Sequence, residues 1–263
     1  SASYLMGIVA SLLVGKLVIV SWHLVFLVYL CAVPVLILNW KYLPDHDREF
    51  SDKKSAEKKQ VSDKYRKKKW TALWIILGMA VVNMGFYTFN SSISLFMYQE
   101  NLGESSVSGR IVSLFMLSGF LTGLLLEQIR KKTKGFTTAL AAVCMGGGFA
   151  LLMLTKSIGI LLIGALLIGA SYSIFYAEVF LAIGRCSGNQ KENTRLVTYT
   201  TAAMFAGQFV SGYLLRIIEF ISRMQGYRFR FGVLATGFLI FAVCYIWKKK
   251  AVFRGVQSKN LVL

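Results

Sequence analysis

Long apolar blocks, separated by short polar segments, make up most of the chain. Each block has at least 18 residues, close to the roughly 20 that a membrane-spanning helix needs. Because hydrocarbon offers no water to the backbone, a spanning segment must bond its N–H and C=O groups internally, and no block shows the two-residue alternation of a barrel strand. The blocks cover residues 4–21, 24–43, 71–98, 109–129, 136–155, 158–184, 195–220 and 230–247. The sequence therefore predicts an all-α polytopic membrane protein with about eight transmembrane helices.

The composition excludes a soluble single domain and narrows the partners. Of all residues 56% are apolar and only 16% are charged, whereas an ordinary soluble domain has about 25% charged residues. The formal net charge is +18, but the cations stand in clusters beside the apolar blocks, without interleaved aromatic residues. We therefore expect a lipid bilayer and no nucleic acid as partner. The four cysteines form no CxxC pair, and we predict no metal site and no cofactor.

The positions of Lys and Arg predict how the helices are oriented. If every block crosses the membrane, the regions richest in these residues fall on one side: 41–69, 130–134, 185–195 and the tail after residue 247. The positive-inside rule then places the central linker and the C-terminus in the cytoplasm, and the protein in the cytoplasmic membrane as a multi-pass protein. The last loop on the other side is an exception, because it carries Arg223, Arg228 and Arg230.

A strongly charged segment, residues 44–69, divides the chain into two helices before it and six after it. Such a segment is typical of a solvated linker that is partly helical or disordered. Six helices form a plausible complete unit and two do not. We therefore expect about four further helices before Ser1, in a truncated fragment of a longer protein.

Three local stretches resemble the major facilitator superfamily (MFS). The turn at 21–26 is similar to the short outer turn between the fifth and sixth helices of bacterial members. Residues 123–132 resemble the cytoplasmic loop motif in its second-half copy, in which Gly123, Glu127 and the basic run Arg130, Lys131 and Lys132 match while two family positions are replaced. Residues 206–209 are similar to a segment of the eleventh helix.

The resemblance covers essentially the whole chain as family helices 5 to 12. It implies the last two helices of an N-terminal bundle at 1–43, a cytoplasmic linker at 44–69, a six-helix C-terminal bundle at 70–248 and a cytoplasmic tail at 249–263. It also implies secondary active transport of a small solute by alternating access, with the missing N-terminal half as partner. The role implied for the loop motif is conformational, although Glu127 could equally be a simple interfacial charge.

A departure from the family concerns drug antiporters. Their fifth-helix motif is matched here by Gly7 and Gly15, but Ser11, Leu12 and Lys16 replace its other small residues and proline. Drug antiport is therefore unsupported. Gly7, Ser11 and Gly15 still predict a close helix–helix contact.

Polar side chains inside the apolar blocks indicate where a solute could bind, because such groups face other helices or water rather than lipid. Asn83, Tyr87, Asn90 and Ser94 share one helical face. This uncharged stripe suits a neutral polar or zwitterionic solute, and helix–helix hydrogen bonding is the alternative interpretation. The residues that we expect to line a solute cavity are Asn83, Tyr87, Asn90, Tyr172, Tyr176 and Gln208. Gln208 belongs to a second stripe rich in threonines, which can instead bond their own helix backbone.

Glu178 is the one acidic residue well inside a predicted span. Because burial disfavours a carboxylate, this group could load and release a proton as access alternates, which would couple transport to a proton gradient. The rival interpretation is a structural interaction near the inner mouth, with Arg185 on the same helical face.

No enzymatic set is present. The two histidines lie in no metalloprotease or nucleophile motif, and no phosphate-binding loop of an ATP-driven pump occurs. We therefore predict a transporter and not an enzyme. The alternatives that remain are a polytopic membrane enzyme and an inactive truncated transporter.

Overall fold

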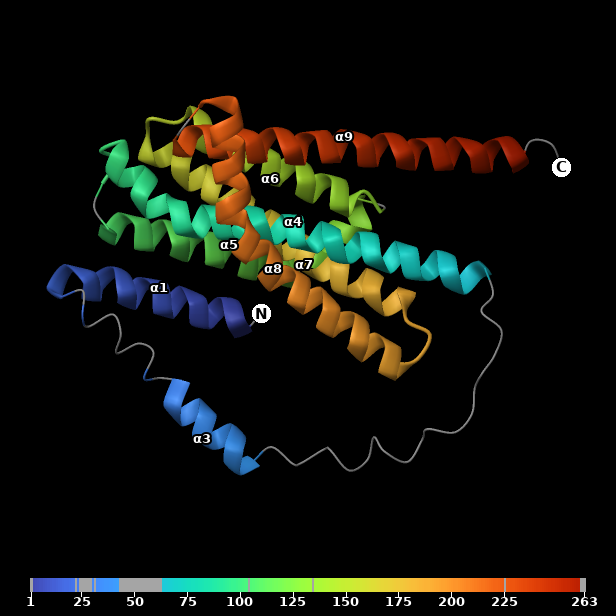
Figure 1. Cartoon of the computed structure of the whole chain (residues 1–263), viewed down its shortest axis with the longest axis horizontal. Coiled ribbons are helices and arrows are strands. Elements are labelled where there is room, and N and C mark those ends of the chain that lie inside the picture. Colours follow the sequence, from blue (N-terminus) through green and yellow to red (C-terminus); the bar gives the residue numbers. More distant parts are fainter. Residues whose placement is uncertain are drawn as a thin grey trace.

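The structure is a computed structural model that describes residues 2–21, 23, 30, 32–42, 63–103, 105–133, 135–224 and 226–260. Within them, all regular secondary structure is helical (Figure 1), which confirms the all-α prediction. The main helices are α1 (Ala2–Val20), α3 (Ala32–Tyr42), α4 (Asp63–Gln99), α5 (Ser105–Thr133), α6 (Thr137–Leu154), α7 (Ile158–Cys186), α8 (Gln190–Ser222) and α9 (Tyr227–Asn260).

Six of the described helices, α4 to α9, are long and apolar enough to cross a membrane. They coincide with the six blocks predicted after the linker. Helix α1 covers the first block with 19 residues. The second block is described only in part, since residues 24–29 lie outside the described residues and α3 begins at Ala32.

Two helices continue into segments predicted as polar linker and tail. Helix α4 begins at Asp63, and α9 reaches Asn260. Both extensions are rich in Lys and lack proline; straight-chain residues lose little rotamer freedom in a helix, so a helix started in the apolar block can continue through them. The rest of the predicted linker, residues 44–62, lies outside the described residues.

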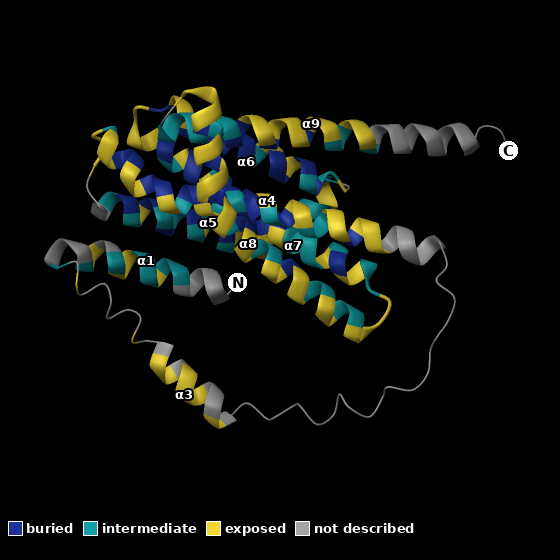
Figure 2. Ribbon diagram, in the orientation of Figure 1, coloured by how far each residue is buried: buried dark blue, intermediate teal, exposed yellow. Residues whose placement is uncertain are grey.

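The six helices form a bundle in which α4 packs on α8, α5 on α7 and α6 on both α7 and α9. Exchanging α4–α6 with α7–α9 keeps the pairs α4–α8, α5–α7 and α6–α9, as two related three-helix repeats would, but the extensive α6–α7 packing has only a slight counterpart between α9 and α4. The buried residues gather where these helices meet, whereas α8 is largely exposed (Figure 2).

Glycines set the closest approaches in this bundle. A Cβ atom at Gly169 of α7 would overlap the Phe115 carbonyl of α5, and one at Gly207 of α8 would overlap the Ala80 carbonyl of α4. In α6, Gly146 faces Leu239 of α9, and Gly148 lies against the Gly164 carbonyl of α7. Gly146 and Gly148 therefore let α6 pack closely against two neighbouring helices.

Helix α1 packs along α5 (Figure 1). A Cβ at Gly7 would lie 3.1 Å from Met116 Sδ, and the hydroxyls of Ser11 and Ser113 are 2.7 Å apart. Two of the three small residues predicted to form a helix contact therefore do so, while the side-chain environment of the third, Gly15, is not described.

The bundle has two ends that differ in charge. We call the end formed by the start of α4, the α5–α6 turn, the α7–α8 turn and the last turns of α9 the basic end. The other end holds the α4–α5, α6–α7 and α8–α9 connections, and we call it the opposite end. At the basic end, α8 starts with an N-cap in which Asn189 Oδ1 accepts from Glu192 N at 2.8 Å and Glu192 Oε2 accepts from Gly188 N at 2.7 Å.

Candidate functional site

Three of the six predicted cavity residues meet at one point between three helices. Asn83 of α4 is fully buried, and its Oδ1 accepts hydrogen bonds from Tyr172 Oη of α7 at 3.2 Å and from Gln208 Nε2 of α8 at 3.3 Å. Its Nδ2 donates to the Met79 carbonyl at 3.0 Å. A carboxamide left without partners in this position would be costly. The arrangement therefore fixes Asn83 and orients the two neighbouring side chains.

Aromatic rings continue from this junction along α7. Tyr172 stacks on Phe86 of α4 with ring centroids 4.3 Å apart, and Tyr176 lies 4.7 Å from Phe180 one turn further on. Tyr172 is almost completely buried, whereas Tyr176 is 43% exposed. The row thus runs from the buried amide to the surface of the bundle.

The other two predicted residues on α4 lie at the edge of this group. The Tyr87 side chain is nearly half exposed. Asn90 is partly buried, and its Nδ2 donates back to the Phe86 carbonyl of its own helix at 3.0 Å.

The threonines of the second stripe also bond their own helix. Thr194, Thr198 and Thr201 each donate to the carbonyl four residues earlier. Gln208, by contrast, donates a hydrogen bond from its side-chain amide to Asn83 on another helix. The described geometry therefore favours backbone bonding over solute binding for the threonines.

Glu178 faces α5 rather than the Asn83 junction. Arg130 Nε, near the end of α5, lies 2.9 Å from Glu178 Oε1. That oxygen is buried and, within the described residues, accepts no well-directed hydrogen bond. The partner is thus a residue of the loop motif, whereas the sequence suggested Arg185.

Of the remaining motif residues, Glu127, Lys131 and Lys132 lie at the surface of the basic end. Glu127 pairs with Lys131 at 2.8 Å, with a Glu127 side chain that is 81% exposed. Gly123 is close to Ser173 of α7, since a Cβ there would lie 3.3 Å from the Ser173 hydroxyl. The Lys132 side chain is exposed.

The opposite end holds two guanidinium–carboxylate pairs with two hydrogen bonds each. Arg230 Nε and Nη2 donate to Glu219 at 2.7 and 2.9 Å, and the Gly226 N–H donates to Glu219 Oε1 at 3.3 Å. The Glu219 side chain is only 8% exposed. This carboxylate therefore fixes the α8–α9 turn, in which Gly226 has a φ of 120° that favours glycine.

The second pair joins three helix ends. Arg228 Nε and Nη2 each donate to Glu100 at 2.6 Å. The same guanidinium donates to the Met153 carbonyl at 2.9 Å and the Thr155 carbonyl at 3.0 Å. It thus satisfies carbonyls at the C-terminal end of α6, where a cation is also favoured by the helix dipole. Arg228 lowers the pKa of the Glu100 carboxyl, chiefly through these hydrogen bonds.

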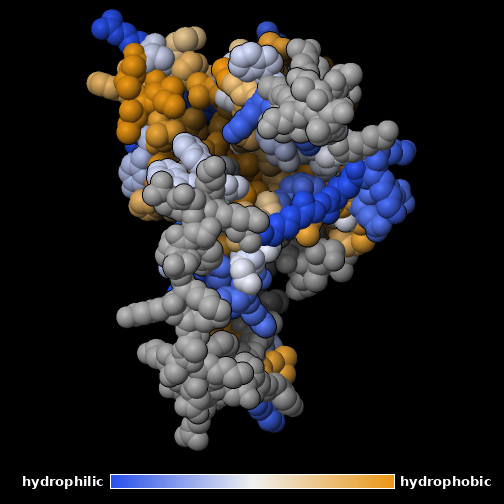
Figure 3. Space-filling view, turned by 90° about the vertical axis from the view of Figure 1, so that its right-hand side faces the viewer, coloured by the Kyte–Doolittle hydropathy of each residue, from blue (hydrophilic) through white to orange (hydrophobic). Residues whose placement is uncertain are grey.

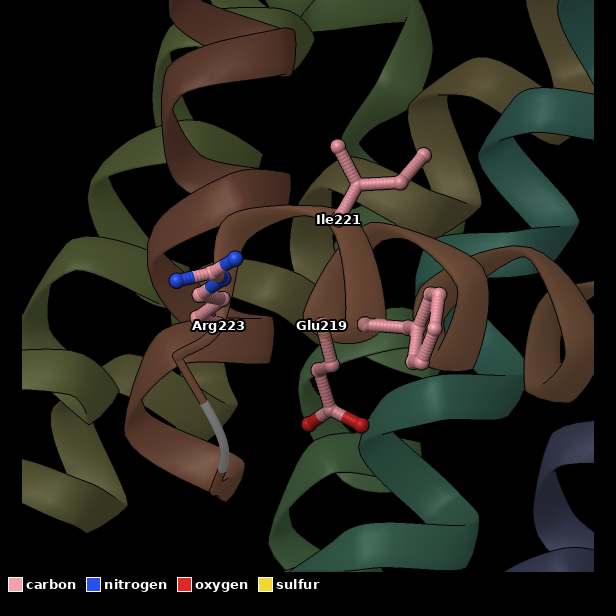
Figure 4. A pocket seen from close by; sticks show the side chains of 4 residues that line it. Glu219, Ile221 and Arg223 are labelled. Atoms are coloured by element: carbon pink, nitrogen blue, oxygen red, sulfur yellow. The ribbon is translucent and has the colours of Figure 1, made fainter.

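An open pocket of about 570 Å³ lies beside these pairs and is lined by Glu219, Phe220, Ile221 and Arg223 (Figure 4). Glu219 and Ile221 point in opposite directions (Figure 4). The side chains that line this pocket do not converge on one point.

Local sequence does not identify the partners of Glu100 and Glu219. Each is an isolated acid at the end of an apolar block, and the only available signal is the unexplained presence of Arg228 and Arg230 on the side that should be poor in cations. Pairing them requires knowledge of which helix ends are neighbours.

Comparison with known proteins gives one match. The family model described as Major Facilitator Superfamily matches residues 1–211. No curated protein and no solved structure matches the chain. The matched region ends within α8, and α9 lies outside it. Helix α9 contacts the matched region through its packing on α6 and through the Arg228–Glu100 pair at the opposite end.

Proposed function

This chain belongs to the Major Facilitator Superfamily, and from that premise we propose that it binds a small, uncharged or zwitterionic polar solute and moves it by alternating access. The family and the six spanning helices support a multi-pass membrane transporter. The finer proposal rests on one observation, the buried Asn83 amide that joins α4, α7 and α8 beside the exposed ring of Tyr176.

The groups around that amide determine the class of solute. Asn83 is already bonded, so we assign it the role of holding Tyr172 and Gln208 in place. The partly exposed side chains of Gln208, Tyr176 and Tyr87 remain accessible to a solute. Amide and phenol groups donate and accept hydrogen bonds without carrying a fixed charge, and a ring face adds apolar contact. This wall suits a polar solute without net charge.

The test uses the full-length protein in proteoliposomes and solute counterflow with a panel of radiolabelled sugars, amino acids, organic anions and amines. Once a solute is found, Tyr176→Phe should raise the KM roughly three- to tenfold, the effect of one lost hydrogen bond. Tyr213→Phe, which removes the same hydroxyl from an exposed position on α8, is the matched control and should leave the KM unchanged. Exchange of organic anions alone, or equal kinetics for both variants, would contradict the proposal.

Two roles compete for Glu178. The contact with Arg130 supports an ion pair that holds the end of α5 against α7. The buried Oε1 without a well-directed hydrogen bond supports the second candidate, a carboxyl that takes up a proton during the cycle.

Two variants separate these roles. If Glu178 couples transport to protons, Glu178→Gln should abolish accumulation driven by a pH gradient but retain counterflow, while Arg130→Gln should retain both in part. If the pair is structural, both variants should lower the melting temperature and impair both modes alike.

We further place the basic end in the cytoplasm, since positive residues in short loops favour that side. The linker and the C-terminus then lie in the cytoplasm, and the two pairs of the opposite end lie at the outer surface.

A further inference from the structure

The basic end brings together two cationic segments that are far apart in the sequence. Lys249 of α9 lies against the α5–α6 turn, where its Nζ donates to the Gly135 carbonyl and sits 4.7 Å from the ring centroid of Phe136. Gly135 has a φ of 89°, and a Cβ there would lie 2.8 Å from the Lys249 ammonium. The turn therefore leaves room for the Lys249 side chain of α9, which a side chain at position 135 would obstruct.

The cations around this contact fall into two groups. Three are engaged within the protein: Arg130 with Glu178, Lys131 with Glu127, and Lys249 with Gly135 and two aromatic rings. Lys132 and Lys248 are exposed, and within the described residues neither has an ion-pair partner.

These two lysines flank the same contact. Lys132 precedes Gly135 by three residues, which is less than one helical turn, and Lys248 is adjacent to Lys249. Because successive residues on a helix are separated by about 100°, Lys248 lies on the flank of α9 when Lys249 faces the turn. Trp247 then points away from the turn, and it is 80% exposed. Figure 3 views the molecule from this end and shows strongly hydrophilic side chains on it, with hydrophobic ones on the flank.

We propose that Lys132 and Lys248 bind the phosphate of one anionic phospholipid where the α5–α6 turn meets the end of α9, with Trp247 at the level of its glycerol ester groups. Two ammonium groups match a phosphate, and basic pockets between membrane helices bind such headgroups on the cytoplasmic side. An exposed indole is favoured at the membrane–water interface. The acyl chains of the lipid hold its phosphate at this depth, whereas a soluble phosphate has no such anchor.

The test measures binding of phosphatidylglycerol to the purified full chain by native mass spectrometry, with phosphatidylcholine as the neutral lipid. The double variant Lys132→Gln/Lys248→Gln should weaken phosphatidylglycerol binding roughly 30-fold, from about fivefold per lysine. The double variant Lys156→Gln/Arg223→Gln, which removes two exposed cations from the opposite end, should leave it unchanged.

Each outcome decides the proposal. Equal loss of lipid in both double variants would show a general charge effect and overturn the proposal. Unchanged lipid binding in both double variants would overturn it as well. Displacement of phosphatidylglycerol by millimolar glycerol phosphate would assign the site to a soluble phosphate and also overturn it. Trp247→Ala should weaken the binding of phosphatidylglycerol while leaving the charge unchanged, so an unaffected affinity would contradict the place given to the indole.

Discussion

Arginines at the opposite end and lysines at the basic end carry the same charge but are used differently. Arg228 and Arg230 each donate two hydrogen bonds to a carboxylate from another helix. At the basic end, the Glu127–Lys131 pair is almost fully exposed, and two further lysines face outwards. Planar guanidinium groups match carboxylates in two-point contacts, whereas an ammonium is a mobile point charge. Two arginines of the opposite end are therefore tied to carboxylates, whereas two lysines of the basic end face their surroundings without an ion-pair partner among the described residues.

This difference explains why the α8–α9 connection is an exception in the distribution of Lys and Arg. Two of its three arginines connect helix ends, Arg228 those of α4, α6 and α9, and Arg230 those of α8 and α9. Both arginines thus have a structural partner at this end. The contrast between the ends can be tested by removing one charge at a time.

Glu219→Gln should give the largest effect. The change leaves the half-buried guanidinium of Arg230 without its charged partner and weakens the α8–α9 turn, so we expect a loss of roughly 3 kcal/mol in the free energy of unfolding. Unfolding of the purified protein in mixed micelles by increasing SDS measures it. Arg223→Gln, at an exposed position on the same turn, is the control; equal effects of the two variants would show that the buried pair adds no particular stability.

Glu100→Gln should have a smaller effect, about 1–2 kcal/mol, because Arg228 keeps its bonds to the Met153 and Thr155 carbonyls. The pair also predicts a pH dependence. Since the pKa of Glu100 is lowered in the folded protein, its contribution is fully present above the ordinary pKa of a glutamate and is lost as the pH falls through the lowered value. The difference in melting temperature between wild type and Glu100→Gln should therefore disappear in acid. A difference that grows as the pH falls would contradict this sign.

Arg130→Gln should cost less again, about 1 kcal/mol or below, because the pair with Glu178 is partly exposed and is held at the end of two helices. The same unfolding assay measures it. If this variant proved as damaging as Glu219→Gln, the basic end would be as firmly tied as the opposite end, and the contrast between them would be lost.

Lys131→Gln should produce the smallest effect, with no measurable change in melting temperature, because the pair with Glu127 is exposed and its contribution is reduced by solvent and salt. Lys249→Gln is the informative companion at this end, since its ammonium contacts Gly135 and Phe136 and its loss should be detectable. Equal behaviour of the two lysines would show that the contact of α9 with the turn adds no stability.

Much of the fold could be predicted because lipid imposes simple rules on the sequence. Spans α4 to α9 follow from apolar length, and the small residues Gly7 and Ser11 predict a helix contact. The sequence could not say that α5 receives this contact. Periodicity specifies which residues share a face of one helix, but it does not specify which helix lies opposite that face.

The candidate site shows the same division. Asn83 was selected because it is polar within an apolar block, and its full burial against Tyr172 and Gln208 depends on residues 89 and 125 positions away. The partner expected for Glu178 lay seven residues along its own helix, but the observed partner, Arg130, lies on a neighbouring helix. Ion pairs between helices require the packing to be known first.

The contrast between the ends depends on the bundle crossing the bilayer with the basic end in the cytoplasm. Single cysteines in a variant without native cysteines test this most directly, at Lys132→Cys and Lys191→Cys on the basic end and at Lys156→Cys and Arg223→Cys on the opposite end. In intact cells a membrane-impermeant maleimide should label Lys156→Cys and Arg223→Cys only, and all four after the membrane is opened. Labelling of both Lys132→Cys and Lys191→Cys in intact cells would contradict the orientation. Labelling of only one of these two sites would contradict the arrangement of the helices, which places both at the same end.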